Sequence, residues 1–216
     1  MEYITELNWS TDFTAYAEFF KEWANNEPGW HDHSNDYGSW VIVRPHILEN
    51  LEYFKKLNVL FKEQGFMIHD AVYRTVAPKR FNGIHTDSVM TKRGVNELLT
   101  LSLNIPLENQ QAATTRWYDF SNNPMFKDEE TREGVKTTES LFSKLLERRL
   151  LGPVLWCSTF SFKMNGPVMI NTGIPHNVDM RLAKNPRSIL SVHLRDLETN
   201  EVLGWEDRYR VLKITF

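Results

Sequence analysis

Residues 98–107 read LLTLSLNIPL, and this stretch determines the expected fold. Successive side chains of an extended chain point to opposite faces of the sheet, so the stretch has one apolar and one polar face. The apolar face consists of Leu99, Leu101, Leu103 and Ile105, and the polar face of Thr100, Ser102 and Asn104. The stretch RSILSVHL repeats this pattern, with Leu190, Val192 and Leu194 opposite Arg187, Ile189, Ser191 and His193. Two such strands indicate a sheet with a dry core on one side and a polar interior on the other.

Helical patterns precede the strands. A one-faced helix is expected from Ser10 to just before Pro28, and a second from Ile47 to a left-handed cap at Gly65. Eight strand-like stretches follow, at 67–76, 97–107, 113–120, 154–162, 166–172, 176–180, 187–194 and 209–216. We expect a mainly β protein with N-terminal helices (α+β): an antiparallel sandwich or barrel whose one sheet is covered by those helices. Residues 1–216 are expected to form a single domain, with helical support over 1–65, a β core over 66–216 and an insertion near 122–151.

The composition excludes several classes of partner. The formal net charge of −3 and the lack of a dense Lys/Arg stripe argue against nucleic acid as a partner. The chain has no run of 18 apolar residues, so no membrane insertion is expected, and the single cysteine, Cys157, suits a reducing compartment. We therefore expect a cytoplasmic protein. The oligomeric state is not predicted, although the expected C-terminal strand at 209–216 offers an edge for pairing.

The stretch FNGIHTDSVM, residues 81–90, is a candidate metal site. In an extended segment His85 and Asp87 project from the same face, which suits two ligands of one metal ion. His176 is the expected third ligand because it follows a Gly/Pro turn in NTGIPHNVDM, at the start of a strand. Two histidines and a carboxylate on one side of a metal leave positions open and are typical of non-haem Fe(II) oxygenases.

A rival metal site lies in HDHSND, residues 31–36, where His31 and His33 share a face if the segment is extended. Its polar composition favours a solvated loop after the first helix. Packing is the expected role of Trp30 and Trp117, and a structural role that of His193.

Arg187 begins a strand on its polar face. A guanidinium inside a pocket requires an anion, and its planar fork matches a carboxylate. We therefore expect Arg187 to bind a carboxylate-bearing ligand.

The order His85, Asp87, His176 and then Arg187 resembles that of the Fe(II)/2-oxoglutarate-dependent oxygenases, in particular their prolyl-hydroxylase-like branch. The resemblance covers about residues 75–194 and is strongest in IHTD, SLNIPLEN, GIPHNV and RSILS. It implies a double-stranded β-helix of the jelly-roll or cupin type, with Fe(II), 2-oxoglutarate and O2 as cofactor and cosubstrates. His85, Asp87 and His176 match the catalytic iron ligands, and Arg187 matches the residue that pairs with the distal carboxylate of 2-oxoglutarate.

The resemblance also suggests residues around the cosubstrate. Ser102 matches a position near the cosubstrate, Asn104 is expected to close its strand, and Thr115 is expected to line the pocket. The implied activity is a dioxygenase that hydroxylates a peptidyl residue, an amino acid or a small metabolite while 2-oxoglutarate is decarboxylated to succinate.

Two departures from the pattern keep alternatives open. Many members have a serine two residues after the arginine, where this chain has Ile189, and the turn after Asn104 reads ENQQAA rather than being glycine-rich. A cupin-like isomerase or dioxygenase would use the metal without 2-oxoglutarate. A binding module with a vestigial site is a third, non-enzymatic alternative.

Overall fold

The computed structural model describes residues 3–9, 13–27, 31–33, 38–79, 87–90, 96–118, 158 and 160–214. The predicted ligand His85, Cys157, Trp30 and the insertion at 122–151 lie outside these residues. The helices are η1 (Phe13–Tyr16), α1 (Ala17–Asn26), α2 (Pro45–Leu48), α3 (Glu52–Glu63), η2 (Gln110–Ala112), η4 (Trp205–Asp207) and α7 (Arg208–Val211). The strands are β1 (Ile4–Glu6), β2 (His31–His33), β3 (Gly38–Val43), β4 (Phe66–Val76), β5 (Ser88–Met90), β6 (Asn96–Leu98), β7 (Leu101–Glu108), β8 (Thr114–Trp117), β9 (Phe160–Phe162), β10 (Val168–Asn171), β11 (His176–Asp179) and β12 (Arg187–Asp196).

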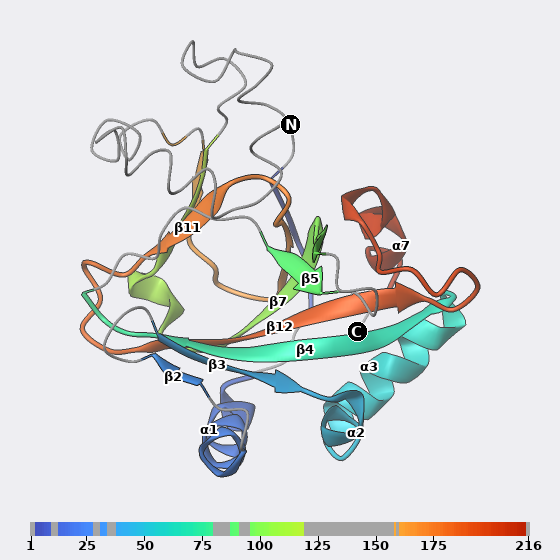
Figure 1. Ribbon diagram of the computed structural model, residues 1–216, viewed down its shortest axis with the longest axis horizontal. Coiled ribbons are helices and arrows are strands. Elements are labelled where there is room, and N and C mark those ends of the chain that lie inside the picture. Colours follow the sequence, from blue (N-terminus) through green and yellow to red (C-terminus); the bar gives the residue numbers. More distant parts are fainter. Residues whose placement is uncertain are drawn as a thin grey trace.

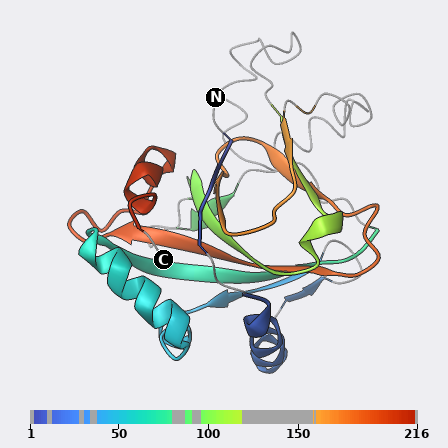
Figure 2. The same ribbon diagram turned by 180° about the vertical axis from the view of Figure 1, so that it is seen from behind.

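A large sheet organises the molecule. Its strand order is β1-β10-β7-β12-β4-β3-β2, and each of its described pairs is antiparallel. Figures 1 and 2 show α1, α2 and α3 on one side of this sheet, with β11 and β5 on the other. The expected antiparallel β architecture, with N-terminal helices covering one sheet, is therefore confirmed.

A small sheet of order β11-β8-β9 faces the large sheet, and β5 and β6 form a separate hairpin.

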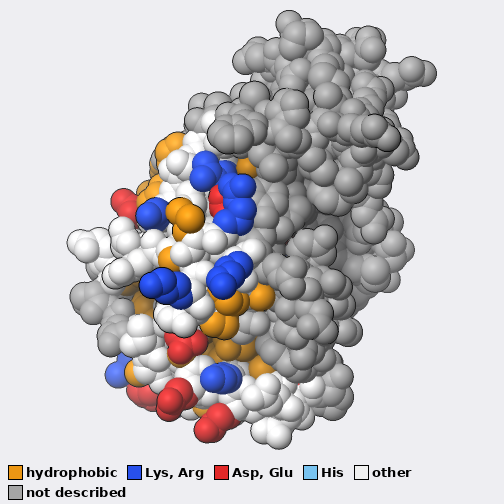
Figure 3. Space-filling model, turned by 90° about the vertical axis from the view of Figure 1, so that its left-hand side faces the viewer, with side chains coloured by type: hydrophobic (Ala, Val, Ile, Leu, Met, Phe, Trp, Pro, Cys, Tyr) orange, Lys and Arg blue, Asp and Glu red, His pale blue; other side chains and the backbone are white. Residues whose placement is uncertain are grey.

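The outer face of the small sheet carries an ion-pair cluster around Asp179. The guanidinium of Arg181 donates two hydrogen bonds to this carboxylate, at 2.9 and 2.7 Å, and Arg116 Nη2 lies 3.4 Å from it. The bonds from Arg181 keep the pKa of Asp179 below its usual range. Figure 3 shows the side of the molecule that lies on the left in Figure 1, and several Lys and Arg side chains are exposed on it.

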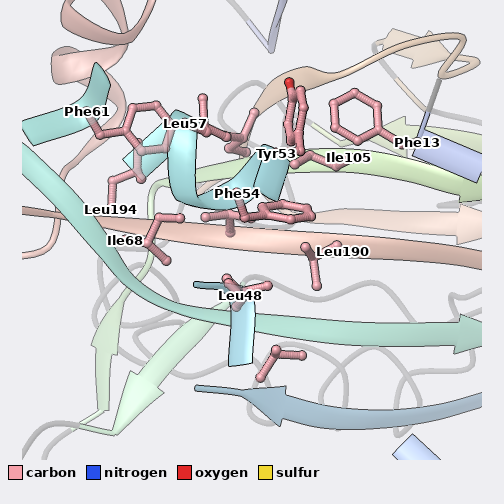
Figure 4. Packing of buried hydrophobic residues seen from close by; sticks show 14 of the residues in the cluster. Phe13, Leu48, Tyr53, Phe54, Leu57, Phe61, Ile68, Ile105, Leu190 and Leu194 are labelled. Atoms are coloured by element: carbon pink, nitrogen blue, oxygen red, sulfur yellow. The ribbon is translucent and has the colours of Figure 1, made fainter. Parts of the chain in front are cut away.

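The main core lies between the large sheet and the helices. The alternation read from the sequence is confirmed, because Leu190 and Val192 of β12 and Leu103 and Ile105 of β7 are at most 1% exposed within this core. Figure 4 shows Phe54, Leu57 and Phe61 of α3 packed near β4 and β12. Full burial of one such side chain contributes about 1.5–3 kcal/mol, so this layer anchors the sheet firmly.

The predicted helices form because each has one apolar face. Phe13, Ala17, Phe20 and Ala24 are buried at the spacing expected of the first helix. The second splits into α2 and α3, and the chain leaves α3 through Gly65, whose φ of +81° is the left-handed conformation that glycine adopts without strain. Arg210 Nη2 lies 3.3 Å from the position that a Cβ would take there.

Two expectations about segments outside the central strands are wrong. Residues 31–33 form β2, which pairs with β3, rather than belonging to a solvated loop. The expected strand at 209–216 is replaced by α7 and a turn. Val211 and Ile214 are buried while Tyr209 and Leu212 are exposed, so the burial follows a spacing of three residues, not two.

Within the described residues, none of the helices has the length and apolar character that would let it cross a membrane.

Candidate active site

The structure places the inner face of the large sheet opposite the helix-covered face. On β12 this inner face carries Arg187, Ile189, Ser191 and His193, as the sequence predicted. The paired strand β4 contributes the residues directly opposite, in the pairs Arg187↔Val76, Ile189↔Arg74, Ser191↔Val72 and His193↔Asp70. Charged and polar groups therefore gather between the two sheets.

Asp87 lies at the entrance to β5 and is held by its backbone. Its N–H donates to the carbonyl of Thr172 at 3.2 Å, and its own carbonyl accepts a hydrogen bond from the N–H of Leu99 at 3.1 Å. The side chain is 11% exposed, and its Oδ1 lies 3.8 Å from Arg74 Nη1. The carboxylate is thus nearly buried, next to a cation on the inner face.

His176 begins β11 and is 3% exposed. Its Nδ1 lies 3.0 Å from the carbonyl oxygen of Ile174. Because a carbonyl can only accept, this contact places the proton of the neutral ring on Nδ1, so Nε2 is the nitrogen with the lone pair that could bind a metal. Trp117, the register partner of His176 on β8, stacks on the ring with centroids 6.2 Å apart and planes at 29°.

The turn between β10 and β11 brings Asp87 and His176 to the same end of the molecule. Thr172, which accepts the hydrogen bond from Asp87, also donates its hydroxyl to the carbonyl of Leu99 at 2.7 Å. Gly173 follows, and a Cβ there would lie 2.8 Å from Thr100 Cγ2, so only glycine lets this turn approach so closely. Four residues after Thr172 the chain reaches His176.

Among the described residues, no three His, Cys, Asp or Glu side chains are placed to hold a metal ion. The predicted ligand set includes His85, which is not described, so the triad itself stays a prediction.

Arg187 is buried without a matching anion. Only 2% of it is exposed, its Nε donates to Gln110 Oε1 at 2.5 Å, and its Nη2 contacts Met164 Sδ at 3.9 Å. Its Nη1 is buried and has no hydrogen-bond partner in the part of the chain that the structure describes. No carboxylate of the described residues forms an ion pair with it. The positively charged guanidinium therefore has only a neutral amide, that of Gln110, and a thioether, that of Met164, as hydrogen-bond partners among the described side chains.

The pKa of Arg187 reflects this environment. Burial, together with the neighbouring cation Arg74, lowers the pKa to about 10. At neutral pH the guanidinium still carries its charge.

Gln110 holds this arginine in place. Its Nε2 donates to the backbone carbonyls of Glu108 and Ser188, at 2.6 and 2.7 Å, while its Oε1 accepts from Arg187. The amide thus joins the end of β7 to the start of β12, next to the arginine.

The other predicted pocket residues lie on buried inner positions. Ser102 Oγ donates to Asn104 Oδ1 at 3.1 Å, and Asn104 pairs in register with Ser191. Thr115 is buried on the small sheet, between its register partners Val178 and Phe162. One expectation is wrong: Asn104 does not close its strand, because β7 continues to Glu108.

Ser188, which directly follows Arg187, does not take the place of the serine that many members of the family have two residues after the arginine. Ser188 faces the opposite side of β12, where its hydroxyl donates to Glu108 Oε2 at 3.1 Å. Ile189 occupies the inner face. Of the two neighbouring serines, only Ser191 shares the face of Arg187.

Sequence reasoning missed three residues that contact the predicted site residues: Arg74, Gln110 and Met164. Arg74 had a readable signal, since it sits on an alternate position of the strand-like stretch 67–76. Gln110 and Met164 lie far from Arg187 in the sequence and follow no period.

A cleft of about 830 Å³ adjoins the neighbours of Arg187, because its lining includes Gln110 and Met164 together with Glu108, Lys184 and nearby loop residues. Neither Asp87 nor His176 lines it. We place the candidate active site at Asp87, His176 and Arg187 rather than in this cleft, because the buried charge of Arg187 has no carboxylate partner among the described residues.

Comparisons with known proteins support the fold. No family model and no curated protein sequence matches the chain. Among solved structures, the α-ketoglutarate-dependent non-haem carbocyclase SnoK of nogalamycin biosynthesis is similar over 98% of this chain and 85% of its own, with a TM-score of 0.53 and 11% identity.

Two further structures are similar at lower scores. HygX from Streptomyces hygroscopicus, solved with nickel and 2-oxoglutarate, matches over 88% of this chain and 80% of its own, with a TM-score of 0.47 and 9% identity. A Pseudomonas putida prolyl-4-hydroxylase matches over 88% of this chain and 90% of its own, with a TM-score of 0.44 and 10% identity.

The chain has the double-stranded β-helix fold of the Fe(II)/2-oxoglutarate-dependent oxygenases, and the predicted fold class is confirmed.

Proposed function

We propose that this protein is a non-haem Fe(II)/2-oxoglutarate-dependent dioxygenase that hydroxylates a small-molecule or peptidyl substrate. Within this proposal His85, Asp87 and His176 hold the iron, and Arg187 holds the distal carboxylate of 2-oxoglutarate. Ser102, Asn104 and Thr115 line the cosubstrate pocket.

The observation that carries the proposal is the buried charge of Arg187 with its unpartnered Nη1. Removing an ion from water without a partner is strongly unfavourable, so such a site is expected to take an anion. A carboxylate supplies two acceptor oxygens for a guanidinium and relieves both the charge and the free N–H.

The donors of the metal site also fit. His176 presents Nε2 once Nδ1 is bound to Ile174, and Asp87 contributes a nearly buried carboxylate. When bound, iron with 2-oxoglutarate and O2 supplies the oxidation of an unactivated C–H bond, coupled to decarboxylation of the cosubstrate to succinate.

The chain's own residues orient these groups and limit access of water. Trp117 packs on the His176 ring and fixes its plane, while its indole N–H donates to the carbonyl of Asn171 at 3.0 Å. Gln110 fixes the fork of Arg187 so that Nη1 stays available. The site is thereby arranged before its ligands arrive, which lowers the cost of ordering it on binding.

An anaerobic titration tests the proposal. Purified apo-protein receives Fe(II) and then 2-oxoglutarate, and the visible charge-transfer band of the chelate is recorded. We expect a band near one iron per chain, loss of the band in His176→Ala, and retention in His46→Ala, which changes an exposed histidine of α2.

Iron binding without a band would contradict the use of 2-oxoglutarate and favour a cupin-like metalloenzyme. Absence of metal binding would contradict the enzyme assignment altogether.

A further inference from the structure

The inner face of the large sheet continues beyond the proposed metal site onto β3. Arg74 of β4 pairs in register with Trp40 of β3, and Val72 pairs with Ile42. Side chains of direct partners in antiparallel strands share a face. Because Arg74 lies within 3.8 Å of Asp87, Trp40 and Ile42 extend the same face outward from the candidate site.

This extension, which we call the β3 strip, consists of Trp40, Ile42, Val72 and Arg74. Its apolar members on β3 are unusually open: Trp40 is 40% exposed and Ile42 is 52% exposed. The alternate residues Val41 and Val43, which face the helices, are at most 3% exposed. The strand therefore has one face buried in the core and one apolar face that is partly exposed beside the site.

Arg74 gives the strip a charge that the proposed cofactors do not use. Its side chain makes no hydrogen bond among the described residues, and its 3.8 Å contact with Asp87 is longer than a hydrogen bond. Asp87 is assigned to the metal and Arg187 to the distal carboxylate of 2-oxoglutarate. The charges of Fe(II), 2-oxoglutarate, Asp87 and Arg187 cancel, so the positive charge of Arg74 is left over.

We infer that the β3 strip binds the substrate, and that the substrate is a small aromatic or alicyclic carboxylate. Its flat apolar part lies on Trp40 and Ile42, and its carboxylate pairs with Arg74 at the edge next to Asp87. This assignment rests on the proposed function, because it places the carboxylate end beside the metal. An exposed aromatic and an arginine are the groups that recognise such a molecule, through stacking and a planar ion pair.

Binding of two matched probes to the whole apo-protein tests the inference without requiring turnover. The probes are 2-naphthoate and its neutral counterpart 2-naphthamide, each titrated by saturation-transfer NMR and calorimetry. We expect the acid to bind about tenfold more tightly than the amide, since one charge-assisted pair separates them. Arg74→Gln should abolish this preference, and Ile42→Ser should weaken both probes.

Val59→Ser is the matched control for Ile42→Ser. Val59 lies on α3, is also 52% exposed and faces away from the site, so its replacement should leave both affinities unchanged. Thermal unfolding of each variant establishes that it is folded.

Equal binding of acid and amide, or an acid preference that survives in Arg74→Gln, would overturn the inference. The iron and 2-oxoglutarate titration on the same variants separates it from the proposed function. If Arg74→Gln instead weakened 2-oxoglutarate, Arg74 would serve the cosubstrate and the substrate assignment would be wrong. If wild-type protein formed no chelate band, the proposed function would fail, even where the acid preference held.

Discussion

Arg187 Nε donates a 2.5 Å hydrogen bond to Gln110 Oε1, and the rest of the guanidinium is buried with no carboxylate partner among the described residues. The two residues are 77 positions apart in the chain. The connection between β7 and β8 therefore determines how the arginine at the start of β12 is presented.

Replacing Gln110 tests this connection. Gln110→Ala removes the acceptor for Arg187 and the donor to two backbone carbonyls, so we expect a loss of about 1–3 kcal/mol in unfolding free energy. We also expect the 2-oxoglutarate concentration for half-saturation to rise about tenfold, with a smaller change in kcat. Urea unfolding and anaerobic 2-oxoglutarate titration measure the two effects. Gln111→Ala, an exposed neighbour, is the control, and an unchanged 2-oxoglutarate requirement in Gln110→Ala would show that Gln110 has only a structural role.

Replacing Arg187 distinguishes a ligand-binding arginine from a structural one. If its charge has no partner in the ligand-free protein, Arg187→Met should leave unfolding free energy unchanged or raise it, by up to about 4 kcal/mol, while 2-oxoglutarate binding is lost. Burial lowers the pKa of Arg187 to about 10 in the folded protein. The buried charge therefore reduces the unfolding free energy of the wild type fully below pH 10, and this reduction becomes smaller above pH 10, where the folded protein loses the proton first. The stability gap between variant and wild type should therefore narrow from pH 8 to pH 10.5. Destabilisation of the ligand-free variant by several kcal/mol would indicate a structural partner for the charge.

Replacing Trp117 tests the positioning of His176. Trp117→Phe keeps an aromatic ring but loses the N–H bond to Asn171, so stability should fall by about 1 kcal/mol. Metal affinity should fall about tenfold, because the partners of a ligating histidine fix its orientation. Metal titration of apo-protein measures this, with Trp205→Phe as a buried tryptophan outside the site. Equal metal affinities in the two variants would argue against a positioning role.

Acid stability tests the turn after β12. Asp196 accepts hydrogen bonds from the Thr199 N–H, from Arg210 Nη1 and from the Glu198 N–H, which together lower its pKa to about 2. A depressed carboxyl pKa stabilises the fold above its unfolded value near 3.8, and that contribution is lost as pH falls toward 2. Asp196→Ala should therefore melt lower than wild type at pH 6, and the difference should shrink between pH 4 and pH 2. Glu198→Ala, which changes an exposed residue of the same turn, should show no such pH dependence.

Local pattern was enough to predict the sheet and its inner face. The alternation in residues 98–107 and 187–194 depends only on the two-residue period of a strand, and the dry and polar faces lie where it places them. The same rule, applied to residues 38–43, would have found β3, whose Val41 and Val43 are buried. Short polar stretches such as 31–33 escape it, because a neighbouring strand and not their composition makes them extended.

The sequence by itself determined which residue types were available for a metal and for a carboxylate, and on which face of each strand they stand. Only the tertiary structure decided that Arg187 has no anion among the described residues, that Gln110 and Met164 are its neighbours, and that Arg74 lies beside Asp87. The physical reason is that burial and charge balance depend on which strands and loops meet in space. These contacts join residues that are dozens of positions apart in the chain, so a local sequence period cannot predict them.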